Sequence, residues 1–276
     1  MDRKAIARET LNIMERGYYE IESRKIEIGE LQEHSIKESF LLTPEQGEAL
    51  LNACKANNKS GVENLLSERT YVWNCSSVDA ILKLSSEGKE DIAVLNFASA
   101  KNPGGGFLNG AMAQEESLAA SSCLYKTLME HREYYEKNRV CNTMMYTNYA
   151  IYSPDVLFFR DGKFRLLEKP VTTSVLTLPA VNMGQVLLKG EDVKEAEQVM
   201  KRRMKLSLAI FAKQKCKHLI LGAYGCGVFR NDPNKIALWY KELLEEFFLD
   251  KFESIVFAVM DRSSSQDCIR AFQNIY

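Results

Sequence analysis

The sequence predicts an α/β fold, in which a β-sheet lies between layers of helices. Short runs rich in β-branched and aromatic residues recur from Tyr71 to the C-terminus, as is typical of buried strands. Stretches with apolar residues at steps of three and four separate these runs, as is typical of amphipathic helices. Alternation of strands and helices over one chain favours a single sheet with helices on both faces.

The first 70 residues are predicted to form a helical extension. Residues 3 to about 20 place apolar side chains at steps of four, three and four, namely Ala7, Leu11, Met14 and Tyr18. A second helix is expected in TPEQGEALLNACKANN, where Thr43 can cap the helix and Pro44 fits its first position. We therefore divide the chain into an extension, residues 1–70, packed on a body, residues 71–276.

The body contains the strand candidates and the longer helical patterns. The strand candidates are YVWNC, IAVLNF (92–97), NYAIYS, VLFF, SVLTLPAV (174–181), HLILGA (218–223) and SIVFAVM (254–260). The clearest helical patterns are Val193, Ala196, Met200, Met204, Leu208 and Phe211, and later Ile236, Tyr240, Leu243 and Phe247. No repeat or Pro/Gly-rich linker interrupts this order, so the extension is expected to pack onto the body.

Composition and charge exclude several classes of protein. The 276 residues carry a formal charge of -1, which argues against bulk nucleic-acid binding and an anionic membrane surface. Seven cysteines, without a CxxC pair, indicate neither a disulfide framework nor a thiolate zinc site, and we expect a reducing, cytoplasmic location. The three widely spaced histidines predict no metal site. The charged N-terminal stretch resembles neither a signal peptide nor a membrane span.

Two glycine loops follow predicted strands. The strand IAVLNF runs into ASAKNPGGGFLNGAMAQEES, in which three glycines precede a helix that begins near Gln114. The second loop, GAYGCGVFRNDP (222–233), enters a helix with Asp232 as cap and Pro233 at its first position. Open α/β sheets bind ligands at the carboxyl ends of their strands, and glycine lets backbone N–H groups approach an anion. A pair of such loops is suited to bind a diphosphate. Either loop alone is also consistent with an ordinary tight turn.

An alternative interpretation of the first loop is a dinucleotide-binding motif. Gly104, Gly106 and Gly110 give GxGxxxG after a strand, which is close to the Rossmann pattern. That pattern places an acidic ribose ligand at the end of a second strand about twenty residues later. Here the residues at that distance still follow a helical pattern, so we rank this reading lower.

The run NPGGGFLNGAMAQEE resembles the signature of the poly(ADP-ribose) glycohydrolase family, in which a glycine triplet precedes Gln-Glu-Glu. The triplet is Gly104, Gly105 and Gly106, and the acidic group is Gln114, Glu115 and Glu116. LNFASAKNPGGGF, IYSPDVLFFRD, VTTSVLTLPAVN and GAYGCGVFRNDP resemble successive blocks of the bacterial branch, in the same order. The resemblance covers roughly Tyr71 to the C-terminus and, more loosely, the helical N-terminus.

The resemblance implies a macrodomain-like mixed sheet flanked by helices that binds ADP-ribose across its crest. The glycine triplet and the stretch Gly225, Cys226, Gly227, Val228 and Phe229 would flank the diphosphate, with Gln114 in the same signature. Phe229 would pack against the ribose beside the scissile bond, although it also fits as an ordinary core aromatic. Many macrodomains place a ribose-binding Asn where this chain has Ser99, and Asn102 is an alternative source of that amide.

By the same resemblance, Glu116 is the catalytic acid and base, and Glu115 binds ribose hydroxyls. Glycosidic cleavage needs an acid for the departing oxygen and a base for the attacking water, and one carboxyl group can serve both steps. Neighbouring helical residues point about 100° apart, so the two glutamates have different tasks. In the alternative interpretation, Glu115 and Glu116 have no catalytic role and occur there because the helix dipole favours acidic residues at a helix N-terminus.

The function implied by the resemblance is hydrolysis of ribose-ribose O-glycosidic bonds in poly(ADP-ribose), which releases ADP-ribose and reverses ADP-ribosylation without a cofactor. Two alternatives stay open: removal of single ADP-ribose groups from a protein or nucleic acid, and a non-catalytic module that binds ADP-ribose. The helical extension is expected to cover one side of the cleft. If the extension closes over the adenosine-side ribose, only the ends of the poly(ADP-ribose) chain can enter the cleft.

Overall fold

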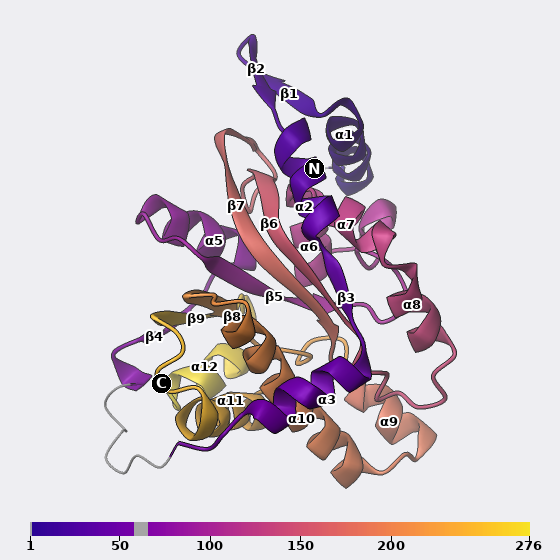
Figure 1. Ribbon diagram of the computed structural model, residues 1–276, viewed down its shortest axis with the longest axis vertical. Helices are drawn as coiled ribbons and strands as arrows, with labels where there is room; N and C mark the ends of the chain where they lie inside the picture. The colour runs from indigo at the N-terminus through magenta and orange to yellow at the C-terminus, as the bar shows by residue number, and fades with distance from the viewer. Residues whose placement is uncertain (1, 58–65) are drawn as a thin grey trace.

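Seven strands form one mixed sheet in the part of the chain that the computed structural model describes, residues 2–57 and 66–276 (Figure 1). Their order is β3-β6-β7-β5-β8-β9-β4, and β7, β5, β8, β9 and β4 are parallel to their neighbours in that series. β6 is antiparallel to β7, and β3 to β6. The bounds are β3 Phe40–Leu42, β4 Thr70–Trp73, β5 Ile92–Ala98, β6 Ala150–Arg160, β7 Leu166–Pro179, β8 His218–Leu221 and β9 Ser254–Ala258.

The strand candidates of the body are confirmed, with one difference. NYAIYS and VLFF belong to a single strand, β6, whose pairing with β7 shifts register between Ser153 and Val156. Pro154 lacks an N–H group and Asp155 has a positive φ of 49°, so the strand bulges there and continues. The sequence split this strand because proline and aspartate are typical of turns.

Helices cover both faces of the sheet. One face packs against α5 (Ser77–Ser86), α6 (Gln114–Ser121), α7 (Leu124–Glu130) and α8 (Arg132–Arg139). The other packs against α3 (Pro44–Ala53), α9 (Met183–Lys189), α10 (Val193–Lys213), α11 (Pro233–Phe247) and α12 (Asp267–Gln273). In β5, Ile92 and Val94 enter the first core and Ala93 and Leu95 the second, because side chains alternate along a strand. None of the described helices is long and apolar enough to cross a membrane.

Helix ends follow the capping signals in the sequence. Thr43 and Gln46 form a reciprocal capping box at the start of α3, with Pro44 in the first turn. The Asp232 carboxylate accepts the N–H of Asn234, and Pro233 opens α11. These caps fix the direction in which α11 leaves the second glycine loop.

The extension is less helical than the sequence predicts. It contains α1 (Arg3–Arg16), a hairpin of β1 (Tyr18–Ile21) and β2 (Arg24–Glu27), α2 (Gly29–Glu38), the edge strand β3, and α3. The strands are three or four residues long, so no alternating pattern can develop in the sequence. Because β3 pairs with β6, the extension contributes to the same sheet as the body.

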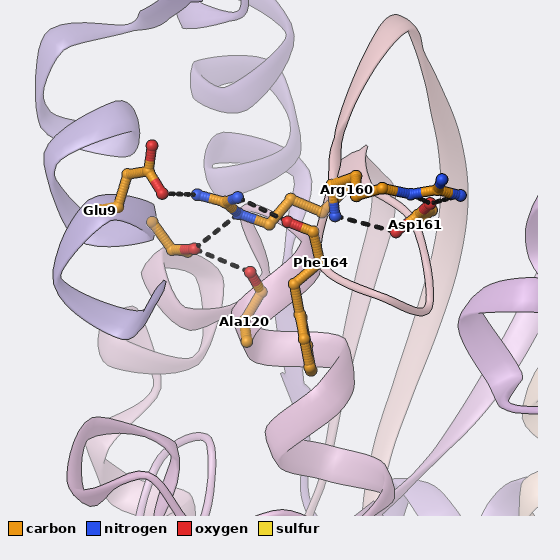
Figure 2. Close-up of polar contacts among 7 residues, drawn as sticks. Glu9, Ala120, Arg160, Asp161 and Phe164 are labelled. Carbon is orange, nitrogen blue, oxygen red and sulfur yellow. Dashed lines mark hydrogen bonds and ion pairs between the residues drawn. The ribbon is translucent and has the colours of Figure 1, made fainter. Parts of the chain in front are cut away.

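A buried arginine fixes α1 to the body (Figure 2). The Arg160 side chain is 3% exposed and forms an ion pair of 2.8 Å with Glu9 of α1. Its Nε donates to the Thr10 hydroxyl and its Nη1 to the carbonyl of Phe164. Thr10 in turn donates to the carbonyl of Ala120 in α6, at 2.7 Å. Since a buried guanidinium must satisfy its donors, this network holds α1 in one position against α6.

Candidate functional site

A cleft of about 600 Å³ opens at the carboxyl ends of β5, β8 and β9. The segment after β5, the start of α6 and the second glycine loop form its walls, and residues after β9 complete it. Clefts of this size at strand ends are the usual ligand sites of α/β folds. The position agrees with the two loops that the sequence singles out.

Gln114 ties the first turn of α6 to β5. Its Oε1 accepts the N–H of Phe97 at 2.9 Å, and its Nε2 donates to the carbonyl of Leu95 at 2.8 Å. The same Nε2 donates to the Ser77 hydroxyl at the start of α5. Both ends of the amide are therefore used within the protein. Although Gln114 lines the cleft, these hydrogen bonds indicate that it positions the two glutamates that follow it.

Glu115 is buried at the floor of the cleft, with 3% of the residue exposed. One carboxyl oxygen accepts the N–H of Ser99 at 2.7 Å, and the other accepts from Asn96 Nδ2 at 3.3 Å. Burial raises the pKa of Glu115 from 4.5 to about 8, and the hydrogen bonds from Ser99 and Asn96 oppose that rise. The group is therefore mainly protonated at neutral pH.

The Glu116 carboxylate is held against the glycine triplet. Its Oε1 accepts the N–H of Gly106 at 2.9 Å, and its Oε2 accepts the N–H of Ala113 at 3.0 Å. Gly105 has a φ of 61°, and a Cβ placed on it would lie 2.4 Å from Glu116 Oε1 and 3.0 Å from Glu115 Oε2. Only glycine fits between the two carboxyl groups and the turn. The triplet thus serves as their backing.

The second glycine loop presents backbone N–H groups. Those of Gly225, Gly227, Val228 and Phe229 have no acceptor among the described residues. Asn231 holds the loop by donating from Nδ2 to the carbonyls of Val181 and Gly225. Nothing lies within 4 Å of the space that a Gly227 Cβ would take, and Val228 is 84% exposed. Consecutive free N–H groups on a rigid loop form a concavity suited to a phosphate.

Phe229 packs at the outer wall, beside the Tyr146 ring, at a centroid distance of 6.1 Å. Sequence reasoning missed the group that organises this wall, Arg203 of α10. Its guanidinium is fully buried and donates to the carbonyls of Met145, Tyr146 and Pro179. A cation on an otherwise apolar helix face is the signal that could have found it.

Most of the predicted site residues meet at the cleft. Its lining includes Ser99, Gln114, Glu115, Glu116, Gly225, Cys226, Gly227, Val228 and Phe229. Asn102 and the triplet Gly104–Gly106 are not part of that lining, and Gly105 and Gly106 lie behind the carboxyl groups. Sequence reasoning also missed Asn96, which bridges Glu115 and the Thr177 hydroxyl. An asparagine within the apolar run IAVLNF is its signal.

The extension is expected to cover one side of the cleft, but no residue of its described part, 2–57 and 66–70, lines the cleft. The residues that line the cleft begin at Cys75. The hydrogen bonds of α1 join it to α6 and to the β6–β7 hairpin. Its first residues therefore approach Glu116 from a separate crevice and not from within the cleft. No group of three or more His, Cys, Asp or Glu residues in 2–57 and 66–276 is arranged to hold a metal ion.

Comparisons with known proteins agree on one family. Residues 7–161 match the microbial-type PARG catalytic domain, where PARG denotes poly(ADP-ribose) glycohydrolase. The structure is similar to that of poly(ADP-ribose) glycohydrolase from Thermomonospora curvata, with 36% identity, coverage of 99% of each chain and a TM-score of 0.91. A structure of the Thermomonospora enzyme bound to the inhibitor ADP-HPD matches at 35% identity, with the same coverage and a TM-score of 0.90. The Deinococcus radiodurans enzyme in complex with ADP-ribose matches at 38% identity over 91% of this chain and 98% of that one, with a TM-score of 0.78. No curated protein sequence matches.

Glu115→Gln should change how the stability of the protein depends on pH. Because the pKa of Glu115 is raised to about 8, its protonated form stabilises the fold fully below pH 4.5, and this contribution is lost as pH rises towards 8. A glutamine at this position does not ionise, so its contribution to stability does not fall with pH. The variant should therefore become more stable relative to the wild type as the pH rises from 4.5 to 8. Thermal unfolding of both proteins at pH 5 and pH 8 measures the difference. An equal offset at the two pH values would contradict the raised pKa.

Gly105→Ala should lower activity strongly, since the new methyl group displaces Glu116. A misplacement of about 1 Å can reduce turnover on the order of 10²-fold. Gly88→Ala is the matched control, because Gly88 has a φ of 74° but nothing within 4 Å of its Cβ position. It should lose about 1 kcal/mol of stability and no turnover. Full activity of Gly105→Ala would show that the triplet does not position the carboxylate.

Proposed function

Because the chain belongs to the microbial-type family of poly(ADP-ribose) glycohydrolases, we propose that it hydrolyses ribose-ribose O-glycosidic bonds with Glu116 as general acid and base. The protein is a glycosidase that acts on poly(ADP-ribose) and releases ADP-ribose. One observation supports the role of Glu116: its carboxylate lines the cleft and is fixed by two backbone N–H groups, from Gly106 and Ala113. A fixed carboxyl group at the wall of a ligand cleft suits proton transfer to and from a bound sugar.

The reaction needs one carboxyl group in two protonation states. In the first step, Glu116 donates a proton to the oxygen that leaves the terminal ribose, while positive charge develops on the ring. In the second step, the same carboxylate takes a proton from the water that attacks the sugar carbon. Apart from the substrate and the attacking water, the scheme uses only residues of the chain, and no cofactor is part of it.

Glu115 is assigned to binding and orienting the terminal ribose. Since burial keeps this carboxyl group mainly protonated at neutral pH, it can donate a hydrogen bond as well as accept one. A ribose hydroxyl both donates and accepts, so it can pair with this group in either direction. The neutral form also adds no negative charge next to an anionic ligand.

The diphosphate is assigned to the second loop. The free N–H groups of Gly225, Gly227, Val228 and Phe229 support this, together with the rigid attachment of the loop through Asn231. The Phe229 ring would then cover the ribose next to the scissile bond. Gly104, Gly105 and Gly106 are assigned to the support of the two carboxyl groups, and Ser99, which lines the cleft, is assigned to the ribose.

The seven free cysteines support a reducing, cytoplasmic location as part of the proposal. Three of them, Cys75, Cys226 and Cys268, line the cleft, where oxidation would alter the ligand site. Partners beyond the polymer, ADP-ribosylated proteins and the ADP-ribose product are not part of the proposal.

Glu116→Gln should separate binding from catalysis. The amide keeps the size of the side chain but cannot transfer the proton, so turnover should fall on the order of 10²-fold or more, while ADP-ribose affinity stays within a few-fold. Glu115→Ala should lose both binding and turnover, since an orienting contact acts in the ground and transition states. Calorimetry with ADP-ribose and a release assay on labelled polymer provide the two measurements. Near-normal turnover of Glu116→Gln would remove Glu116 from the mechanism.

Chelation should leave polymer hydrolysis unchanged, because the proposed steps use carboxyl and backbone groups alone. The measurement is the initial rate of ADP-ribose release before and after dialysis against EDTA. A loss of rate that added Mg²⁺ or Zn²⁺ restores would replace this mechanism by a metal-assisted one.

A further inference from the structure

A second, water-sized crevice of about 10 Å³ adjoins the main cleft. Its lining includes Arg3, Ile6, Phe107, Met112, Glu116 and Phe164. Met112 and Glu116 line both spaces, so the Glu116 side chain lies at the boundary between them. A substrate whose reacting oxygen meets Glu116 therefore has one part in the cleft and can have another part towards Arg3.

The start of α1 packs directly on the end of the first glycine loop. A Cβ placed on Gly110 would lie 3.3 Å from Lys4 Cγ and 3.5 Å from Arg3 Cβ. The Thr10 hydroxyl bonds to the carbonyl of Ala120, one turn along α6 from Glu116. The Arg160 network also holds α1 against the body (Figure 2). These contacts together fix the first turn of α1 at the crevice that Arg3 and Glu116 line.

The charges on this turn favour an anion. Arg3 and Lys4 are exposed, and neither forms an ion pair with any residue of 2–57 or 66–276. Arg8, one turn further, lies 3.9 Å from Asp2, and both of these side chains are mostly exposed. The other nearby acid, Glu9, is occupied by Arg160. Among the described residues, Arg3, which lines the crevice together with Glu116, and its neighbour Lys4 are thus two cations without an ion pair, and the proposed mechanism gives them no role.

We propose that Arg3 and Lys4 form a subsite for the diphosphate of the polymer unit on the leaving side of the scissile bond. This inference rests on the proposed function of Glu116. If the unit to be released occupies the cleft, the group that Glu116 protonates belongs to the neighbouring unit, which carries its own diphosphate. That unit must extend away from the cleft past Glu116. Cations placed there attract it without contacting the ADP-ribose that is released.

Two substrates with the same cleft-bound unit test the subsite. One is a two-unit oligomer of ADP-ribose, and the other is a single ADP-ribose joined at its terminal ribose to an uncharged phenol. Only the first has a diphosphate on the leaving side. Arg3→Glu and Lys4→Glu should each lower kcat/KM for the oligomer about fivefold at low ionic strength, mainly through KM, and the effect should shrink as salt is added.

The phenol substrate and the affinity for ADP-ribose should change by less than a factor of two. Arg16→Glu, at the other end of α1, is the control with the same change of charge, and it should leave both substrates unaffected. Glutamate is favoured in the first turn of a helix, so the variants at Arg3 and Lys4 should fold, and Arg3→Gln provides a milder second variant.

An equal loss on both substrates, or an equal effect of Arg3→Glu and Arg16→Glu, would overturn the subsite while leaving the hydrolytic function intact. Failure of the wild-type protein to cleave either substrate would instead overturn the proposed function, and the subsite with it.

Discussion

The arrangement of the candidate active site depends on the attachment of α6 to β5 through Gln114. The Gln114 side-chain amide accepts the N–H of Phe97 and donates to the carbonyl of Leu95. It thus pairs with two backbone groups of β5, as a neighbouring strand would. This fixes the first turn of α6 in both rotation and translation. The next two residues, Glu115 and Glu116, consequently point to different places, one to the floor of the cleft and one to its wall. The hydrogen bonds from Asn96 and Ser99 to Glu115 then hold the same turn against the end of β5.

Two kinds of environment then separate the neighbouring glutamates. Glu115 is buried, and burial outweighs its hydrogen bonds in setting its raised pKa. Glu116 is partly exposed and accepts one backbone N–H at each oxygen. The glycine triplet makes both possible, because a side chain at Gly105 would enter the space of the two carboxyl groups. A fixed offset between triplet and acids is therefore a requirement of packing, and this explains why their joint pattern is more informative than either part.

Much of the fold can be predicted from the sequence, because its strands are buried on both faces and its long helices have regular apolar periods. The caps at Thr43 and Asp232 also follow from local rules. Features that depend on distant partners cannot be read in this way. The strand order, the fusion of two runs into β6 and the pairing of β3 with it are set by tertiary contacts. At the site, residue types and spacing indicate Glu115 and Glu116, whereas the support from Asn96 and Arg203 appears only when segments far apart in sequence meet.

The division of the chain at residue 70 describes its sequence better than its structure. β3 pairs with β6 and so protects an edge of the sheet that would otherwise expose unpaired N–H and carbonyl groups. The Thr10 hydroxyl and the Glu9 carboxylate reach α6 and Arg160, and both partners belong to the body. Removing the Glu9 carboxylate alone would leave the Arg160 guanidinium buried without its acid, which is more costly than losing an exposed ion pair. We therefore infer that extension and body fold as one unit. The described part of the first 70 residues supports α6 through the Thr10 hydroxyl, although it does not line the cleft.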